Sequence, residues 1–276
     1  METGADDPRE RDQEAGPRDH DQQTAAARAQ YGRQATAYTT SASHAGGADL
    51  ARLRELLAPR GDELLLDVAT GTGHTALAMA PHCLLVTGLD PTPEMLREAR
   101  ALAERRTVAN LALVLGAAER LPFPDGWFDA VTVRRAPHHF ANIPVALSEM
   151  RRVLRPRGRL GLVDQITPDD PAGSALLEAM ERRRDPSHNR ALSVAEWRAA
   201  LAAAGFAVAH LEVDEEQRDL VGYLQIAGVQ GEDRAAVLAI LHGADDAARA
   251  AIGYRADPAP DGSFLKQRIV ILAMRD

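Results

Sequence analysis

Short apolar runs alternate with helical patterns through the first two thirds of the chain, and this alternation limits the possible folds more than any other feature. The runs lack the polar alternation of half-exposed strands, so they indicate strands buried on both faces. Parallel strands joined by right-handed helical crossovers meet that condition. The pattern predicts a doubly wound α/β domain with strands at Glu63–Val68, Cys83–Leu89, Leu111–Leu115, Phe128–Val133 and Arg159–Asp164, and helices at His74–Ala80, Pro93–Arg105 and Asn142–Leu154.

The alternation ends after Asp164. Two helices are expected there, and Ser193 with Glu196 forms a capping box at the start of the second one. Two further strands are expected, separated by a largely helical insert at 219–252. These elements are the helices Pro171–Arg184 and Ser193–Ala204 and the strands Phe206–Val213 and Lys266–Met274.

The amino-terminal part is expected to be a tail followed by two helices. Residues 1–22 are rich in charged residues, glycine and proline, and they offer too little apolar surface to offset the entropy of ordering. Helices are expected at Thr24–Ser43 and Ala48–Pro59. We therefore expect a disordered tail, 1–22, and a single domain, 23–276, with a helical lid made of about 23–58, 171–204 and 219–252.

Composition excludes several classes of function. The net charge of −8 argues against a general nucleic-acid binder, which needs clustered basic residues. Cys83 is the one cysteine, so neither a disulfide framework nor a cysteine-based metal site is expected. No apolar run approaches a membrane span, and the amino terminus lacks a signal sequence. We expect a cytoplasmic protein, and its oligomeric state, monomer or homodimer, stays open.

The stretch LLLDVATGTGHTALAMA joins the first predicted strand to a helix through closely spaced glycines. Its G-x-G-x-x-A pattern, beginning at Gly71, fits a dinucleotide site, a nucleoside site or an ordinary turn. Asp67 suits a ligand with an ammonium group, such as S-adenosylmethionine, and would be unfavourable beside a pyrophosphate. Asp90 ends the second strand and suits the two hydroxyls of a ribose, although a helix N-cap is the alternative.

Four stretches together resemble class I S-adenosylmethionine-dependent methyltransferases. They are LLLDVATGTGHTAL, VTGLDPTPEMLREAR, AAERLPFPDGWFDAVTVRRAPHHF and ALSEMRRVLRPRGRLGLVDQ, and they occur in the order and spacing of that family. The ubiquinone/menaquinone-biosynthesis branch and related bacterial small-molecule enzymes look most similar. The resemblance covers about Tyr31 to Phe206. It implies S-adenosylmethionine as cofactor and a seven-stranded sheet whose last strand is antiparallel.

The resemblance also assigns residues to the cofactor site. Its glycine motif, its ribose-binding acid and the residues beside that acid match this chain, whereas the branch usually has Asp where this chain has Ala117. The missing carboxylate would weaken the hold on the adenine amino group without abolishing binding. The cofactor-binding residues expected are Tyr38, Asp67, Gly71, Gly73, Asp90, Pro91, Met95, Ala117, Ala118, Glu119 and Arg134, with Tyr31 and His44 in the amino-terminal helix nearby.

The chemistry of methyl transfer asks the protein mainly to align the acceptor, and a base is needed only if the acceptor loses a proton. His138 and His139 follow the fourth predicted strand, where open α/β sheets bind ligands, so they are the candidate catalytic bases. Asp164 and the stretch RDPSH (184–188) are candidates for the acceptor pocket. Packing or loop ordering is the alternative role for each of these residues.

The acceptor is expected to be a small, partly apolar molecule held under the helical lid. Leu176, Leu177, Met180, Trp197, Leu224 and Ile226 are the apolar lid residues considered. The type of acceptor atom stays open. Two other functions also remain: a related scaffold that binds the cofactor without transferring its methyl group, and an NAD-dependent oxidoreductase.

Overall fold

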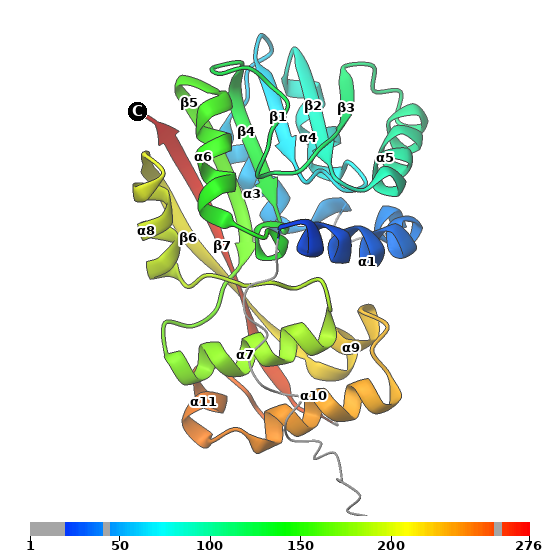
Figure 1. Ribbon diagram of the computed structural model, residues 1–276, viewed down its shortest axis with the longest axis vertical. Coiled ribbons are helices and arrows are strands. Elements are labelled where there is room, and N and C mark those ends of the chain that lie inside the picture. Colours follow the sequence, from blue (N-terminus) through cyan, green and yellow to red (C-terminus); the bar gives the residue numbers. More distant parts are fainter. Residues whose placement is uncertain (1–19, 41–44, 257–260) are drawn as a thin grey trace, which may run out of the picture.

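The described residues form a seven-stranded sheet in the order β3-β2-β1-β4-β5-β7-β6 (Figure 1). This computed structural model describes residues 20–40, 45–256 and 261–276. β7 pairs antiparallel with both β5 and β6, and the other neighbouring strands are parallel, so the expected sheet with an antiparallel last strand is confirmed. The strands are β1 (Leu64–Val68), β2 (Leu85–Asp90), β3 (Leu111–Leu115), β4 (Phe128–Arg134), β5 (Leu154–Gln165), β6 (Phe206–Asp219) and β7 (Ser263–Arg275).

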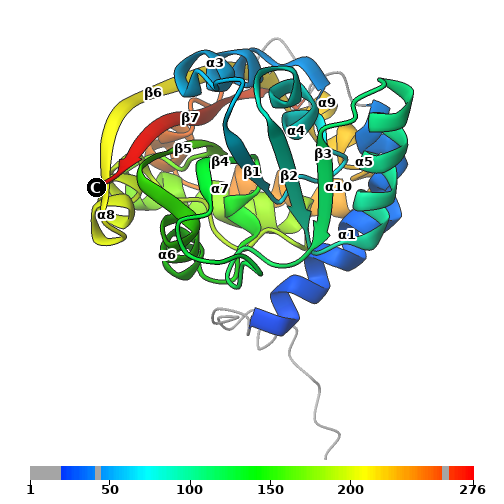
Figure 2. The same ribbon diagram turned by 90° about the horizontal axis from the view of Figure 1, so that it is seen from above.

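Helices cover both faces of the sheet, as the doubly buried strands require (Figure 2). Neighbouring residues of a strand point to opposite faces, so Leu66 belongs to the core under α6 and α8, and Leu65 to the core under α3 and α4. α5 packs beside α4 on the latter face. The helices are α3 (Ala48–Leu57), α4 (His74–Met79), α5 (Pro93–Arg105), α6 (Ile143–Val153) and α8 (Val194–Ala203).

Beyond the sheet, the chain forms a second layer that we call the helical lobe. β6 and β7 run past the end of β5 as an antiparallel pair, and four helices pack around their far ends (Figure 1). The lobe has a core of its own, with Phe264 of β7 and Leu220 among its buried residues. Its helices are α7 (Pro171–Arg184), α9 (Leu220–Ile226), α10 (Gly231–Gly243) and α11 (Asp246–Ala251).

The boundaries of the expected lid need correction. The helix expected at Ser193–Ala204 is α8, which has the capping box of Ser193 and Glu196, but it packs on the sheet through Trp197 and not on the lobe. α3, also expected in the lid, packs on the sheet through Leu53. Indole and leucine side chains placed on these helix faces are fully buried in the sheet cores, which holds both helices there.

The amino-terminal helix α1 (His20–Thr40) lies across the carboxyl ends of the strands, between the sheet and the helical lobe (Figure 1). It begins inside the expected tail, and residues 1–19 lie outside the described residues. Gln23 explains the early start, because its amide donates to the carbonyls of His139 and Ser187. No helix in the described part of the chain is long and apolar enough to cross a bilayer.

We expect Phe264→Ala to destabilise the helical lobe by about 3–5 kcal/mol, the usual cost of emptying a buried phenylalanine site. Because the lobe has its own core, amides of α7 and α10 should lose protection from hydrogen exchange while those of β1 and β4 keep theirs. Phe128→Ala, in the core under α6, is the matched control and should lower protection across the sheet. Equal losses in sheet and lobe for Phe264→Ala would contradict a separate lobe core.

Candidate active site

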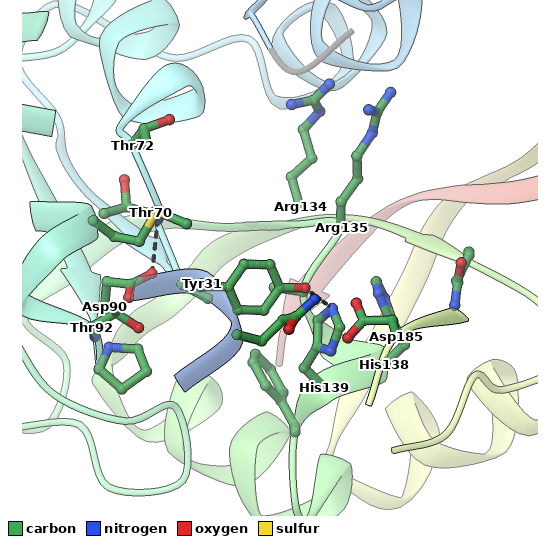
Figure 3. Close-up of a pocket in the computed structure, with 18 of the residues that line it drawn as sticks. Tyr31, Thr70, Thr72, Asp90, Thr92, Arg134, Arg135, His138, His139 and Asp185 are labelled. Atoms are coloured by element: carbon green, nitrogen blue, oxygen red, sulfur yellow. Dashed lines mark hydrogen bonds between the residues drawn. The ribbon is translucent and has the colours of Figure 1, made fainter. Parts of the chain in front are cut away.

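A cavity of about 590 Å³ lies where the carboxyl ends of the strands meet α1 and the helical lobe. Figure 3 shows the residues of its wall, with Asp90 and Thr92 on one side and His138, His139 and Asp185 on the other. The cavity brings together most of the residues expected from the sequence. These are Gly71, Asp90, Pro91, Met95, Ala117, Ala118, Glu119, Arg134, His138 and His139.

Asp67 departs from its expected place, because it does not line the cavity. Its carboxylate accepts hydrogen bonds from Thr70 Oγ1 (2.6 Å), Thr132 Oγ1 (2.7 Å) and the backbone N–H of Ala76 (3.1 Å). Burial raises its pKa to about 6. These groups occupy the carboxylate, so Asp67 holds the turn after β1 in place instead of meeting an ammonium group directly.

The two glycines of the turn have different roles. Gly71 lines the cavity with φ +54°, and a Cβ built on it would meet no atom within 4 Å. The backbone is therefore open to a ligand at this position. Gly73, expected at the cofactor, instead faces α5, where a Cβ would lie 3.1 Å from that of Ala99. Its φ of +84° and this close approach explain the second glycine.

Asp90 presents a carboxylate at the cavity next to Gly71. Its Oδ2 accepts the N–H of Gly71 at 2.9 Å, and its Oδ1 accepts the N–H of Thr92 at 2.8 Å. The Thr92 side chain also hydrogen-bonds to this carboxylate, so one ribose hydroxyl would use the remaining lone-pair position and a second would share or replace the contact of the Thr92 side chain. Thr92 is the N-cap residue of α5, and Asp90 does not cap the helix. The arrangement fits the two hydroxyls of a ribose.

Beside Asp90 the wall becomes apolar through Leu89, Met95 and Ala118, a surface suited to the face of a purine. Ala117 also lines this wall, with a methyl group where the resemblance leads one to expect a carboxylate. Glu119 also lines the cavity, and its Oε1 accepts the N–H of Ala141 at 2.9 Å. Tyr38 belongs to α1, but its side chain and residue His44 lie outside the described part of the chain.

On the opposite side, His139 contacts the lid helix α1. Its Nδ1 lies 3.0 Å from the carbonyl oxygen of Ser187, which can only accept, so Nδ1 carries the proton. Nε2 then accepts the hydrogen bond from the Tyr31 hydroxyl (Figure 3). The rings of Tyr31 and His139 meet edge to face. Burial, and next the neighbouring His138, lower the pKa of His139, so the ring is neutral at physiological pH.

His138 is held from behind by Asp164. Asp164 Oδ2 accepts the backbone N–H of His138 at 2.8 Å, and Oδ1 lies 2.6 Å from the ring Nδ1. Asp164 was a candidate for the acceptor pocket, but it is fully buried and does not line the cavity. Burial raises its pKa to about 7. His188 is also buried and bonds to Glu178 and Gln165, whereas Arg184 and Asp185 line the cavity.

Two adjacent arginines share one carboxylate at the edge of the site. Arg134 and Arg135 each donate through Nε and Nη2 to Asp49 of α3, at 2.8–3.0 Å. Figure 3 shows the two side chains lying next to each other. Arg135 adopts φ +54°, which turns the chain directly after β4. Burial opposes ionisation of Asp49, but the bonds and charges of both arginines lower its pKa to about 2.

Sequence reasoning missed much of the polar wall near the lobe. Of the apolar lid residues considered, Ile226 lines the cavity, whereas Leu176, Leu177, Met180 and Leu224 fill the lobe core and Trp197 the sheet core. The alternation of Lys266 and Arg268 in an otherwise apolar strand was an available signal. Local sequence gave no sign of the wall residues Gln165, Arg218 and Tyr223, or of Gln23 and Asp49, which support the site from outside the cavity wall.

Comparison with known proteins agrees with this geometry. The profile of a family described as a methyltransferase domain matches residues 66–162. The uncharacterized methyltransferase YcgJ of Bacillus subtilis is 34% identical over 219 residues, which cover 79% of this chain and 87% of YcgJ. The chain belongs to the class I S-adenosylmethionine-dependent methyltransferases.

Two solved structures and a second curated relative extend this comparison. The crystal structure of YcgJ has a TM-score of 0.78 at 32% identity and covers 82% of this chain and 97% of its own. A putative methyltransferase of Bacillus halodurans has a TM-score of 0.78 at 32% identity, over 83% of this chain and 99% of its own. The ubiquinone/menaquinone biosynthesis C-methyltransferase of Paracoccus denitrificans is 46% identical over 41% of this chain and 46% of its length.

We expect Asp49→Asn to lower the free energy of unfolding by about 3–5 kcal/mol at pH 7, because it removes the carboxylate that pairs with the buried Arg134 and the half-buried Arg135. The folded-state pKa of Asp49 lies below its unfolded value, so its contribution is present above about pH 4 and is lost as the pH falls toward 2. Urea unfolding at pH 7 and pH 3 measures both effects, with the exposed Asp246→Asn as control. A difference that does not narrow at pH 3 would contradict this linkage.

Proposed function

We propose that this methyltransferase transfers a methyl group to a small-molecule acceptor bound between the ends of β4 and β5 and the helical lobe. The observation that carries the proposal is one cavity with two different sides, a shelf at Asp90 and Thr92 beside Gly71 and a polar side at His138, His139 and Asp185 (Figure 3). Ligand pockets usually span about 300–1,000 Å³, and this cavity lies in that range.

The cofactor end is assigned to residues that line the cavity. Asp90 accepts the ribose hydroxyls, Gly71 lets the ligand approach the backbone, and Met95 with Ala118 packs against the purine. These assignments fit the open space at Gly71 and the carboxylate that Asp90 presents at the cavity. S-adenosylmethionine supplies an electrophilic methyl group on a sulfonium when bound.

The chain's own contribution is to position the acceptor, exclude water and hold a proton. α1 covers the strand ends with Tyr31 facing His139, which leaves the acceptor enclosed. Because Nδ1 of His139 is committed to the Ser187 carbonyl, Nε2 takes the Tyr31 proton while the Tyr31 oxygen takes a proton from the acceptor. The Asp164 carboxyl fixes the orientation of His138, which we assign to positioning of the acceptor.

A second function is favoured by one observation, the alanine at position 117. A protein of this family that binds the cofactor without transferring the methyl group would tolerate the loss of the adenine contact. Formation of S-adenosylhomocysteine with a panel of phenols, amines and thiols separates the two functions. Binding of NAD with no binding of S-adenosylhomocysteine would contradict both.

Asp90→Asn should weaken S-adenosylhomocysteine binding about ten- to a hundredfold, because charged hydrogen bonds contribute about 1.5–3 kcal/mol. Burial raises the pKa of Asp90 to about 6, so the affinity of the unmodified protein should fall below pH 6 as the carboxylate is protonated. The Asn variant should lack that pH dependence. Calorimetry between pH 5 and pH 8 measures both, with the exposed Asp62→Asn as control. Unchanged affinity in Asp90→Asn would show that the ribose does not bind at Asp90.

Tyr31→Phe and His139→Gln should each lower kcat about 10²- to 10⁴-fold for an acceptor that loses a proton, the usual range for general-base catalysis. Affinity for S-adenosylhomocysteine should stay within about threefold, because neither side chain is assigned to the cofactor. His82→Gln, exposed and distant from the cavity, is the matched control. Full activity in both site variants would exclude this proton path.

A further inference from the structure

The end of the cavity next to the helical lobe is strongly cationic. The cavity is lined by Arg184 of α7, Arg218 of β6 and Lys266 and Arg268 of β7, and also by Arg134 and Arg135 at the end of β4. Their carboxylate partners are shared in pairs, since Asp49 serves two of these arginines, Glu181 serves Arg184 and Lys266, and Glu216 serves Arg218 and Arg268. The shared carboxylates bring six cationic side chains together around the cavity.

Unused donors occur at two of these cations. Arg135 bonds to Asp49 through Nε and Nη2, which leaves Nη1 with no partner among the described residues. Arg268 has a side chain that is 10% exposed, and its Nε has no hydrogen bond within the described part of the chain. Asp214 Oδ2 lies 3.6 Å from that Nε. The Nε of Arg268 is itself enclosed, so the guanidinium donor that an anion can reach without a partner among the described residues is Nη1 of Arg135.

Lys266 extends this cluster toward α7. Its Nζ lies 2.9 Å from Glu181 Oε1 and 2.8 Å from Tyr223 OH, and it also donates to Gln165. Burial lowers its pKa, and the charges of Arg184 and Arg268 act in the same direction. Arg268 also contributes to lowering the pKa of Arg135, after burial and Arg134. The cations are therefore close enough to repel one another.

The cluster lies away from the cofactor end. Arg268 pairs across the sheet with Gln165 at the end of β5, whereas the shelf of Gly71 and Asp90 follows β1 and β2. Asp185 is the carboxylate on the neighbouring wall, and it accepts from the N–H and hydroxyl of Ser187 at 2.9 and 2.6 Å. Lys266 and Arg268 thus belong to the acceptor end, and Arg135 lies between the two ends, directly after β4.

Resting on the proposed function, we propose that the methyl acceptor carries an anionic group, a carboxylate or a phosphate, bound by Arg135 and Arg268 beside the charge of Lys266. The planar guanidinium groups match either oxyanion, and Lys266 adds a point charge. This replaces the expectation of a partly apolar acceptor with that of a small anion. The methyl-accepting atom then lies on the side of the molecule that faces Tyr31 and His139.

The test measures anion binding to protein saturated with S-adenosylhomocysteine. The probes are 4-hydroxybenzoate and pyrophosphate, with 4-hydroxybenzamide as the neutral match to the first, and calorimetry in chloride buffer gives the affinities. At least one anion should bind, and the amide at least tenfold more weakly than 4-hydroxybenzoate if the carboxylate is recognised. Binding of pyrophosphate alone would assign the site to phosphate.

Arg268→Gln and Lys266→Gln should each weaken the bound anion about ten- to a hundredfold. Arg106→Gln, an exposed arginine of the sheet domain, is the matched control and should bind as the unmodified protein does. Affinity for S-adenosylhomocysteine should be unchanged in all three, which shows that they fold. Failure of both anions to bind, or equal binding in the site variants, overturns the anionic acceptor.

The proposed function fails on a different result. If the unmodified protein does not bind S-adenosylhomocysteine, the cofactor assignment is wrong whatever the anions do. If S-adenosylhomocysteine binds with the expected dependence on Asp90 but neither anion binds, the cofactor end stands and the acceptor class alone is rejected.

Discussion

The carboxylate of Asp67 joins four parts of the molecule at one point. It starts from β1 and accepts hydrogen bonds from β4 through Thr132, from the turn through Thr70 and from α4 through Ala76. A buried acid with raised pKa is costly to keep, and several hydrogen bonds offset that cost. The position of Gly71, and with it the contact between Gly71 and Asp90, depends on this point.

The second determinant of the site is the length of the last two strands. β6 and β7 pair from Phe206 with Arg275 to Asp219 with Ser263. This pairing continues well beyond Arg268, where the pairing of β7 with β5 ends. Strands that leave the sheet have no helix above them, so another set of helices must cover their apolar side chains. The helical lobe does so, and Lys266 and Arg268 reach the cavity from the length of β7 that connects the two parts.

The sequence predicted the sheet well because its signals are local and repeated. Doubly buried strands have no polar alternation, and α5 spans the predicted residues Pro93–Arg105 without change. Strand ends were less predictable, since β6 continues through acidic residues after Val213 that resemble a loop but pair with β7. The side on which a helix packs is a tertiary property, which explains why α8 was expected in the lid.

The sequence motifs correctly placed Gly71 and Asp90 at the cavity. They did not show which residue near the turn points away from the cavity. Asp67 has the right type and place, but its donors come from β4 and α4, which no local pattern reveals. The shared carboxylates are also invisible in sequence. Asp49 and Arg135 are 86 positions apart, and Glu181 and Lys266 are 85 apart.

The separate core of the helical lobe has an evolutionary consequence. Substitutions on the lobe side of the cavity change packing against Phe264, Leu220 and their neighbours in the lobe core. The turn at Asp67 packs on a different set of side chains. Selection can therefore alter the lobe side of the cavity without disturbing the turn at Asp67. Lineages descended from such a chain should diverge fastest in the lobe and slowest around the first two strands.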